Sequence, residues 1–223
     1  MENKPEFALY PAEAGAETAP LFLLLGDGER AGAAAERVRA LTQRPFSLAG
    51  LPVEDWNMAL SPWPAKAVFK GSEDFGGGGD ATLRDLGIRI LPRVREALGA
   101  PTAPVYLAGY SLAGLLAVYG LYRLPGLAGA VCCSGSLWFP GFLEYAADHD
   151  PAGQPERVYL SLGDREKRSR NPVLSRVEEN TLRFRDLLTV RGIPCAYFPE
   201  PGNHFQDPEG RLARGIAWCL RGE

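Results

Sequence analysis

Histidine is scarce in this chain, which holds two among 223 residues, His149 and His204. So few imidazoles exclude a histidine-rich metal centre and leave few candidates for a general base. Cysteine is also rare, and its four positions are Cys132, Cys133, Cys195 and Cys219. They lack the paired spacing of a zinc site. We therefore predict no metal site, and reduced, buried thiols of the kind typical of a cytoplasmic protein.

Long apolar runs and a strong charge of either sign are absent. The first strongly apolar stretch, "LFLLL", is too short for a membrane span, and the opening "MENKPEFALY" is too polar for a signal peptide. A net charge of −3 gives no reason to expect nucleic acid as a partner. The sequence thus predicts a cytoplasmic protein with no membrane partner, folded as one domain over residues 1–223, and leaves its oligomeric state open.

Short apolar runs alternate with longer helical patterns. The runs that we expect to be strands are Leu21–Leu25, Val105–Gly109, Gly129–Gly135, Val158–Gly163 and Cys195–Glu200. The expected helices are Ala31–Leu41, Thr82–Leu98 with a kink or restart at Pro92, one directly after Ser111, Pro172–Val190 capped by Asn171, and Pro208–Leu220. This alternation predicts the α/β class, with a mostly parallel sheet covered by helices on both faces.

A glycine-rich segment, "GSEDFGGGGD" (Gly71–Asp80), interrupts this pattern. A phosphate-binding loop would need a preceding strand and a Lys-Ser/Thr pair after the glycines, and both are missing. We expect a surface loop near the functional site instead.

The stretch "VYLAGYSLAGLLAVYG" carries the strongest chemical signal. An apolar strand enters the corner Gly109-Tyr110-Ser111-Leu112-Ala113, and a helix leaves it at once. A Gly-x-Ser-x-Gly corner of this kind exposes the serine as a nucleophile above the sheet. Ala113 replaces the last glycine of the strict motif, and the alternative role for Ser111 is that of a helix cap. The strand before it and the helix after it favour the nucleophile.

A serine nucleophile needs a base, and His204 is placed to supply it. It lies in "GNHF", after the last apolar strand and before the last helix. His149 lies in a polar, turn-like stretch that follows no strand, so we expect it on the surface.

Two acids compete for the third position of a triad. Glu166 stands three residues after Gly163 and Asp164 stands immediately after it, at the end of the strand "VYLSLG". Spacing favours Glu166, and membership of a solvated charged loop is the alternative for both. The cations of the same loop could attract an anionic substrate, and they are Arg165, Lys167, Arg168 and Arg170.

An oxyanion hole needs two N–H donors. The residue after the nucleophile, Leu112, provides the first, and the turn "LGDG" offers Asp27 or Gly28 as the second. Aromatic residues at the same end of the sheet are candidates for the substrate pocket, with core packing as the alternative for each. They are Tyr110, Trp138, Phe139 and Trp56.

These motifs together resemble the esterase D and enterochelin-esterase-like branch of the α/β-hydrolases. The likeness lies in "GYSLAGLLAVYGLY", "SGSLWF", "SLGDREKRSRNP" and "PGNHF", and it covers residues 101–223. The resemblance implies an α/β-hydrolase fold with Ser111 as nucleophile, His204 as base and Glu166 or Asp164 as acid. It also leaves open a Ser-His dyad. Members cleave esters, siderophore trilactones or thioesters, and some transfer acyl groups.

The sequence therefore predicts a serine esterase with little or no lid, a small ester as its substrate and no cofactor. Two other functions stay open. One is a catalytically silent binding protein of the same fold, and the other is an acyltransferase that uses the same triad.

Overall fold

Continuous apolar runs of this chain form a seven-stranded sheet in the computed structural model, which describes residues 6–13, 15, 17–26, 28–69 and 71–221. In spatial order the strands are β1 (Ala8–Tyr10), β3 (Ser47–Leu51), β2 (Leu21–Leu25), β6 (Val105–Tyr110), β7 (Leu127–Cys133), β8 (Arg157–Gly163) and β9 (Cys195–Glu200). All neighbours pair in parallel except β1, which is antiparallel to β3. Every position of β2, β3, β6 and β7 is buried, as expected of parallel strands covered on both faces.

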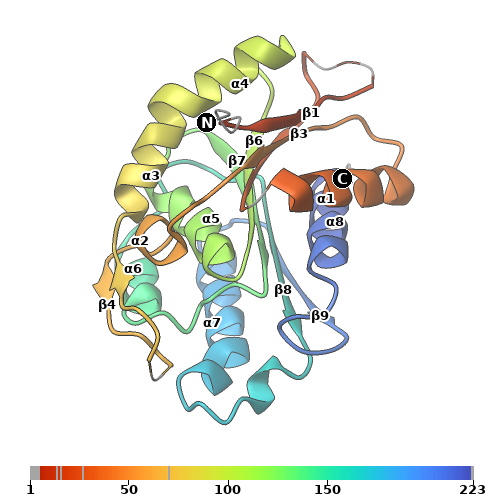
Figure 1. Cartoon of the computed structure of the whole chain (residues 1–223). Helices are drawn as coiled ribbons and strands as arrows, with labels where there is room; N and C mark the ends of the chain where they lie inside the picture. The colour runs from red at the N-terminus through yellow and green to blue at the C-terminus, as the bar shows by residue number, and fades with distance from the viewer. Residues whose placement is uncertain (1–5, 14, 16, 27, 70, 222–223) are drawn as a thin grey trace.

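Helices cover both faces of the sheet (Figure 1). Helices α1 (Gly28–Leu41) and α8 (Pro208–Cys219) bury their apolar stripes on one face. The other face is covered by α3 (Gly79–Asp85), α4 (Leu91–Leu98), α5 (Leu112–Arg123), α6 (Phe142–Asp148) and α7 (Val177–Val190). Helix α5 is buried from Leu112 to Tyr122, because it lies between the sheet and its neighbouring helices. This three-layer arrangement confirms the predicted α/β class.

The expected helix Thr82–Leu98 is divided. A π-turn at Leu86–Ile90 separates α3 from α4, and Pro92 lies in the first turn of α4. Proline has no N–H to donate and fits best at the start of a helix, so the helix restarts there. The expected helix Pro172–Val190 begins with a 3₁₀ turn, where the Oδ1 of Asn171 accepts a hydrogen bond from the N–H of Val173.

The glycine-rich segment Gly71–Asp80, predicted as a surface loop, is exposed at residues 71–74 and then forms regular structure. Phe75–Gly76 (β5) pairs with Pro64–Ala65 (β4) in a short hairpin, and the segment ends inside α3. A Cβ on Gly77 would lie 2.4 Å from Pro64. These glycines therefore let backbone segments pack closely.

The four cysteines are free thiols, and three of them are buried. Burial raises the pKa of Cys133 and of Cys195 to about 12, which keeps both protonated at neutral pH. Within the described ranges, no helix is long and apolar enough to cross a bilayer.

Candidate active site

Ser111 stands between β6 and α5 with a backbone that serine rarely adopts. Its φ is 58° and its ψ is −123°, a conformation that costs about 1–3 kcal/mol and that surrounding contacts must hold. Gly109 makes the corner possible, because a Cβ on it would lie 2.3 Å from the carbonyl group of Ala113. The close contact is with the backbone of Ala113 and not with its methyl group, which is buried. The departure from the strict motif thus leaves the corner intact.

Neighbouring backbone groups hold the serine in this conformation. The N–H of Ser111 donates to the carbonyl of Cys133 at 3.1 Å, and the N–H of Ser136 donates to the carbonyl of Ser111 at 3.0 Å. Both partners belong to the end of β7 and the loop after it, so the adjacent strand holds the corner of β6.

His204 lies in the loop between β9 and α8, and its ring reaches back over the sheet. Its Nε2 is 3.1 Å from Oγ of Ser111, and its Nδ1 is 2.8 Å from Oε2 of Glu166. With the proton on Nδ1, that nitrogen donates to Glu166 and Nε2 accepts from the serine hydroxyl. The other histidine, His149, follows α6, where its ring stacks on Tyr145.

Glu166 lies in the 3₁₀ turn that follows β8, and its side chain is 6% exposed. Oε1 accepts from the Ser134 hydroxyl and the Gly163 N–H, each at 2.7 Å, and from Arg211 at 3.2 Å. Burial alone would raise the pKa of Glu166, but the hydrogen bonds from His204, Ser134 and Gly163 hold it below its usual range. The carboxylate is therefore ionised and oriented toward the imidazole at neutral pH.

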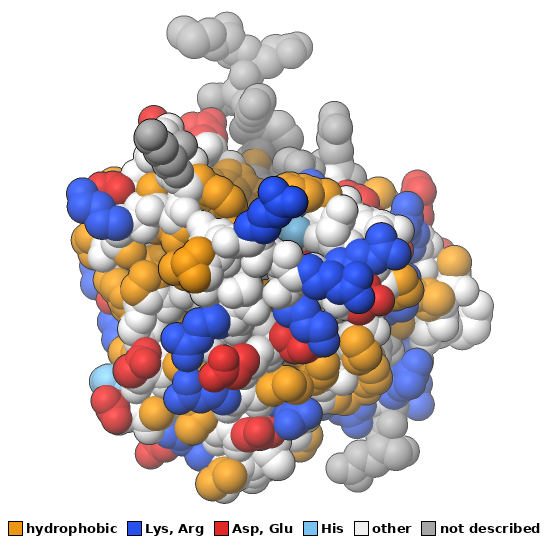
Figure 2. Space-filling view, turned by 90° about the horizontal axis from the view of Figure 1, so that it is seen from below, with side chains coloured by type: hydrophobic (Ala, Val, Ile, Leu, Met, Phe, Trp, Pro, Cys, Tyr) orange, Lys and Arg blue, Asp and Glu red, His pale blue; other side chains and the backbone are white. Residues whose placement is uncertain are grey.

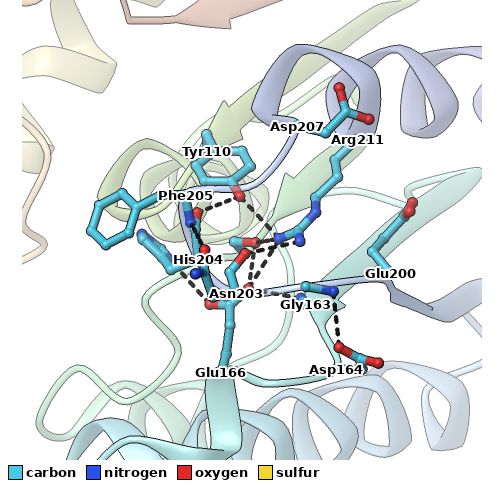
Figure 3. Close-up of polar contacts among 12 residues, drawn as sticks. Tyr110, Gly163, Asp164, Glu166, Glu200, Asn203, His204, Phe205, Asp207 and Arg211 are labelled. Carbon is cyan, nitrogen blue, oxygen red and sulfur yellow. Dashed lines mark hydrogen bonds and ion pairs between the residues drawn. The ribbon is translucent and has the colours of Figure 1, made fainter.

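Asp164 points away from this cluster (Figure 3). Its Oδ1 accepts a hydrogen bond from the N–H of Gly202 at 2.9 Å, and its side chain is exposed. The structure thus brings Glu166, and not Asp164, into contact with His204.

Arg211 completes the cluster and was not among the site residues predicted from the sequence. Its side chain is fully buried in the first turns of α8. A sequence signal was available, because Arg211 lies on the same side of this helix as the apolar residues Leu212, Ile216 and Cys219. An arginine within such a stripe needs a buried partner, and Glu166 is that partner.

The candidate oxyanion donors lie at the same end of the sheet as Ser111. Leu112 is the first residue of α5, so its N–H has no partner within the helix. Gly28 is the first residue of α1, which follows β2, and β2 pairs directly with β6. Asp27 lies outside the described residues.

A cavity of about 580 Å³ opens beside Ser111 and His204. Its apolar walls are Phe69, Trp138, Leu174, Val177 and Phe205. Arg165 and Arg168 add positive charge, and Ser136, Ser169 and Asn203 add polar groups. Figure 2 views the molecule from below the orientation of Figure 1. On this face basic side chains lie beside one of the two visible histidine side chains.

The predicted pocket residues divide into two groups. Trp138 lines the cavity. Phe139 is buried in an aromatic cluster with Trp63 and Phe75, and Tyr110 is buried beneath His204. Trp56 is partly buried at the start of the short helix α2 (Trp56–Ala59), outside the cavity lining. These three aromatics therefore do not line the cavity.

Comparisons with known proteins agree with this architecture. No protein-family model matches the chain. Over 148 residues it is 26% identical to YbbA, an uncharacterised protein of Bacillus subtilis, and the match spans 65% of this chain and 59% of that protein.

Solved structures match the fold over nearly the whole chain. An IroE-like serine hydrolase from Shewanella oneidensis superposes with a TM-score of 0.78 at 19% identity, over 96% of this chain and 75% of that one. The enterochelin esterase of Shigella flexneri superposes with a TM-score of 0.70 at 18% identity, over 96% of this chain and 54% of that one. The siderophore hydrolase EstA of Aspergillus nidulans superposes with a TM-score of 0.68 at 17% identity, over 99% of this chain and 97% of that one. The chain therefore shares its fold with these hydrolases and esterases, and this fold is of the α/β class that the sequence predicted.

Proposed function

We propose that this protein is a serine esterase that cleaves carboxylic esters through an acyl-enzyme on Ser111. The observation that carries the proposal is one unbroken chain of hydrogen bonds from Ser111 through His204 to Glu166, beside an open cavity. A binding protein of the same fold has no use for a strained serine bonded to an oriented imidazole.

The reaction follows from these contacts. Oγ of Ser111 attacks the ester carbonyl carbon while its proton passes to Nε2 of His204. The tetrahedral oxyanion takes hydrogen bonds from the N–H of Leu112 and from an amide at Asp27 or Gly28. The alcohol then leaves with the proton from His204. Water, activated by the same imidazole, releases the acid product and restores Ser111. Glu166 keeps the tautomer of His204 and stabilises its positive charge, and no cofactor takes part.

Small acyl or aryl esters and siderophore-type lactones are the substrates that we propose. Phe69, Trp138 and Phe205 offer aromatic walls to an acyl or aryl group. The structural neighbours named as siderophore hydrolase and enterochelin esterase support the second class. We further propose one domain over residues 1–223, located in the cytoplasm and without a nucleic-acid partner.

Fluorophosphonate labelling tests the proposal before any substrate is known, because such probes react with serines already activated by a base. We expect one adduct, located by peptide mass spectrometry on Ser111 and absent from the Ser111→Ala variant. A screen of short-chain and aryl esters follows, with and without an alcohol acceptor. The absence of any adduct would favour a binding protein, and product transfer to the alcohol would indicate an acyltransferase.

A further inference from the structure

Arg211 contacts all three parts of the candidate active site. Its Nη1 donates to Glu166 at 3.2 Å, to the Ser134 hydroxyl at 2.7 Å and to the Tyr110 hydroxyl at 3.0 Å. Its Nη2 donates to the carbonyls of Pro201 and Asn203, each at 3.0 Å, in the loop that carries His204. One guanidinium group therefore joins the acid, the loop of the base and the residue before Ser111 (Figure 3).

Tyr110 extends this connection to the histidine itself. Its hydroxyl accepts from Arg211 and donates to the backbone carbonyl of His204 at 2.7 Å. Burial raises the pKa of Tyr110 to about 12, so the hydroxyl keeps the proton that it donates. Arg211 is thus connected to His204 in two ways. One is through the Tyr110 hydroxyl, and the other is through the carbonyl of the preceding residue, Asn203.

Stability alone does not account for a charge in this position. Arg211 is 0% exposed, and its Nε has no hydrogen-bond partner within the described residues. Removing a guanidinium from water costs several kcal/mol, and apolar replacements of buried ion pairs are often neutral or stabilising. The glycine at the end of β8 also leaves room for the guanidinium group, since a Cβ on Gly163 would lie 2.8 Å from Nη2 of Arg211.

We propose that Arg211 is a positioning residue of the esterase reaction, which holds Glu166 and the His204 loop at fixed spacing to Ser111. The planar guanidinium presents its donors in a rigid fork, so partners bonded to Nη1 and Nη2 cannot move independently. A lysine ammonium, a compact point charge, cannot reproduce this fork. The proposal rests on the proposed esterase function, and it adds a residue that acts through Glu166 and His204.

Arg211→Met tests this role, with Arg214→Met as the matched control on the same helix. Arg214 bonds the carboxylates of Glu200 and Asp207 at the two ends of the His204 loop, whereas Arg211 bonds Glu166 and the carbonyls within that loop. Using an ester that the parent protein cleaves, we expect Arg211→Met to lower kcat roughly 10- to 100-fold with little change in KM, because small displacements of reacting groups slow catalysis by such factors. Arg211→Lys should not restore kcat, and Arg214→Met should keep the parent value.

A double-mutant cycle separates positioning from general support of the fold. If Arg211 positions Glu166 and the His204 loop, the loss of kcat in the double variant Arg211→Met/Glu166→Gln should be smaller than the product of the two single losses. Fully additive losses, or a folded Arg211→Met protein with kcat within about twofold of the parent, would overturn the proposal. If Arg211→Met does not fold, Tyr110→Phe decides, because it removes one bridge without leaving a buried charge unpaired. Unchanged kcat in that variant would also overturn the role.

Failure of the esterase function itself would look different, because the parent protein would then be neither labelled nor active. In that case the proton resonance of the His204 Nδ1–H group tests the positioning role without any substrate. We expect a downfield signal in the parent protein and in Arg214→Met, lost or shifted in Arg211→Met. The same signal in all three proteins would contradict the proposal.

Discussion

Glu166 and His204 share a hydrogen bond of 2.8 Å, whereas Asp164, two residues before Glu166, bonds the backbone of Gly202. We therefore expect Glu166→Gln to lower kcat on the order of 10³- to 10⁴-fold, since the loss of a triad carboxylate leaves the imidazole without its tautomer and charge partner. Steady-state ester hydrolysis measures this effect.

Asp164→Asn is the matched control for that substitution. An asparagine Oδ1 can still accept from the N–H of Gly202, so activity should stay within about twofold of the parent. A lower activity in Asp164→Asn than in Glu166→Gln would assign the acid to Asp164. Equal activity in the two variants would indicate a Ser-His dyad.

The lowered pKa of Glu166 also predicts how stability depends on pH. A carboxyl group whose pKa is lower in the folded state stabilises that state at any pH above the pKa of the unfolded chain, which is near 4.5. This stabilisation is lost as the pH falls through the pKa of the folded state. The free energy of unfolding of the parent, minus that of Glu166→Gln, should therefore shrink as pH decreases below 4.5. Denaturant titrations across the acid range give the difference, and one that does not change with pH would show that the pKa of Glu166 is not lowered.

The close approach at Gly109 predicts a severe effect of one methyl group. Gly109→Ala should lower the free energy of unfolding by about 3 kcal/mol or more and abolish fluorophosphonate labelling, because the new Cβ would collide with the carbonyl of Ala113. Gly153→Ala is a suitable control, since its Cβ would meet its nearest neighbour at 3.5 Å. We expect that variant to stay within about 0.5 kcal/mol of the parent. Equal unfolding midpoints for the two variants would contradict the geometry of the corner.

The arginines at the cavity predict a preference for negatively charged esters. Arg165 and Arg168 line the cavity, and no carboxylate in the described part of the chain forms an ion pair with either. Replacing both with glutamine should raise KM roughly 3- to 30-fold for an anionic ester, as expected for the loss of one or two exposed charges. KM for a neutral ester of the same size should not change. A parallel rise for both esters would show that the arginines shape the cavity without selecting charge.

The sequence predicted those elements whose pattern is strong and local. The runs that became β2, β6, β8 and β9 are continuously apolar, and the corner at Ser111 has a motif that requires a strand before it and a helix after it. Strand β3, "SLAGL", escaped prediction because small residues give it little apolar contrast, although each of its positions is buried. Helix α6 was not predicted, because it is only two turns long and directly follows an aromatic stretch of sequence.

The site could be predicted only as far as chain order determines it. Position relative to the strands was enough to single out Ser111 and His204. The choice between Asp164 and Glu166 depends on the turn after β8, where the side chain of Glu166 accepts a hydrogen bond from the N–H of Gly163. The burial of Tyr110, Phe139 and Arg211 depends on tertiary packing, which residue type alone does not reveal.

The site residues Ser111, Ser134, Glu166 and His204 follow the carboxyl ends of four adjacent strands, β6 to β9. In the native alignment Tyr110 pairs with Cys133, and Gly163 pairs with Glu200. A slip of one residue between two of these strands would move a side chain by about 3.3 Å, more than a hydrogen bond tolerates. Labelling at Ser111 during refolding would therefore time the moment at which the strands lock into their native alignment, separately from the earlier collapse of the chain.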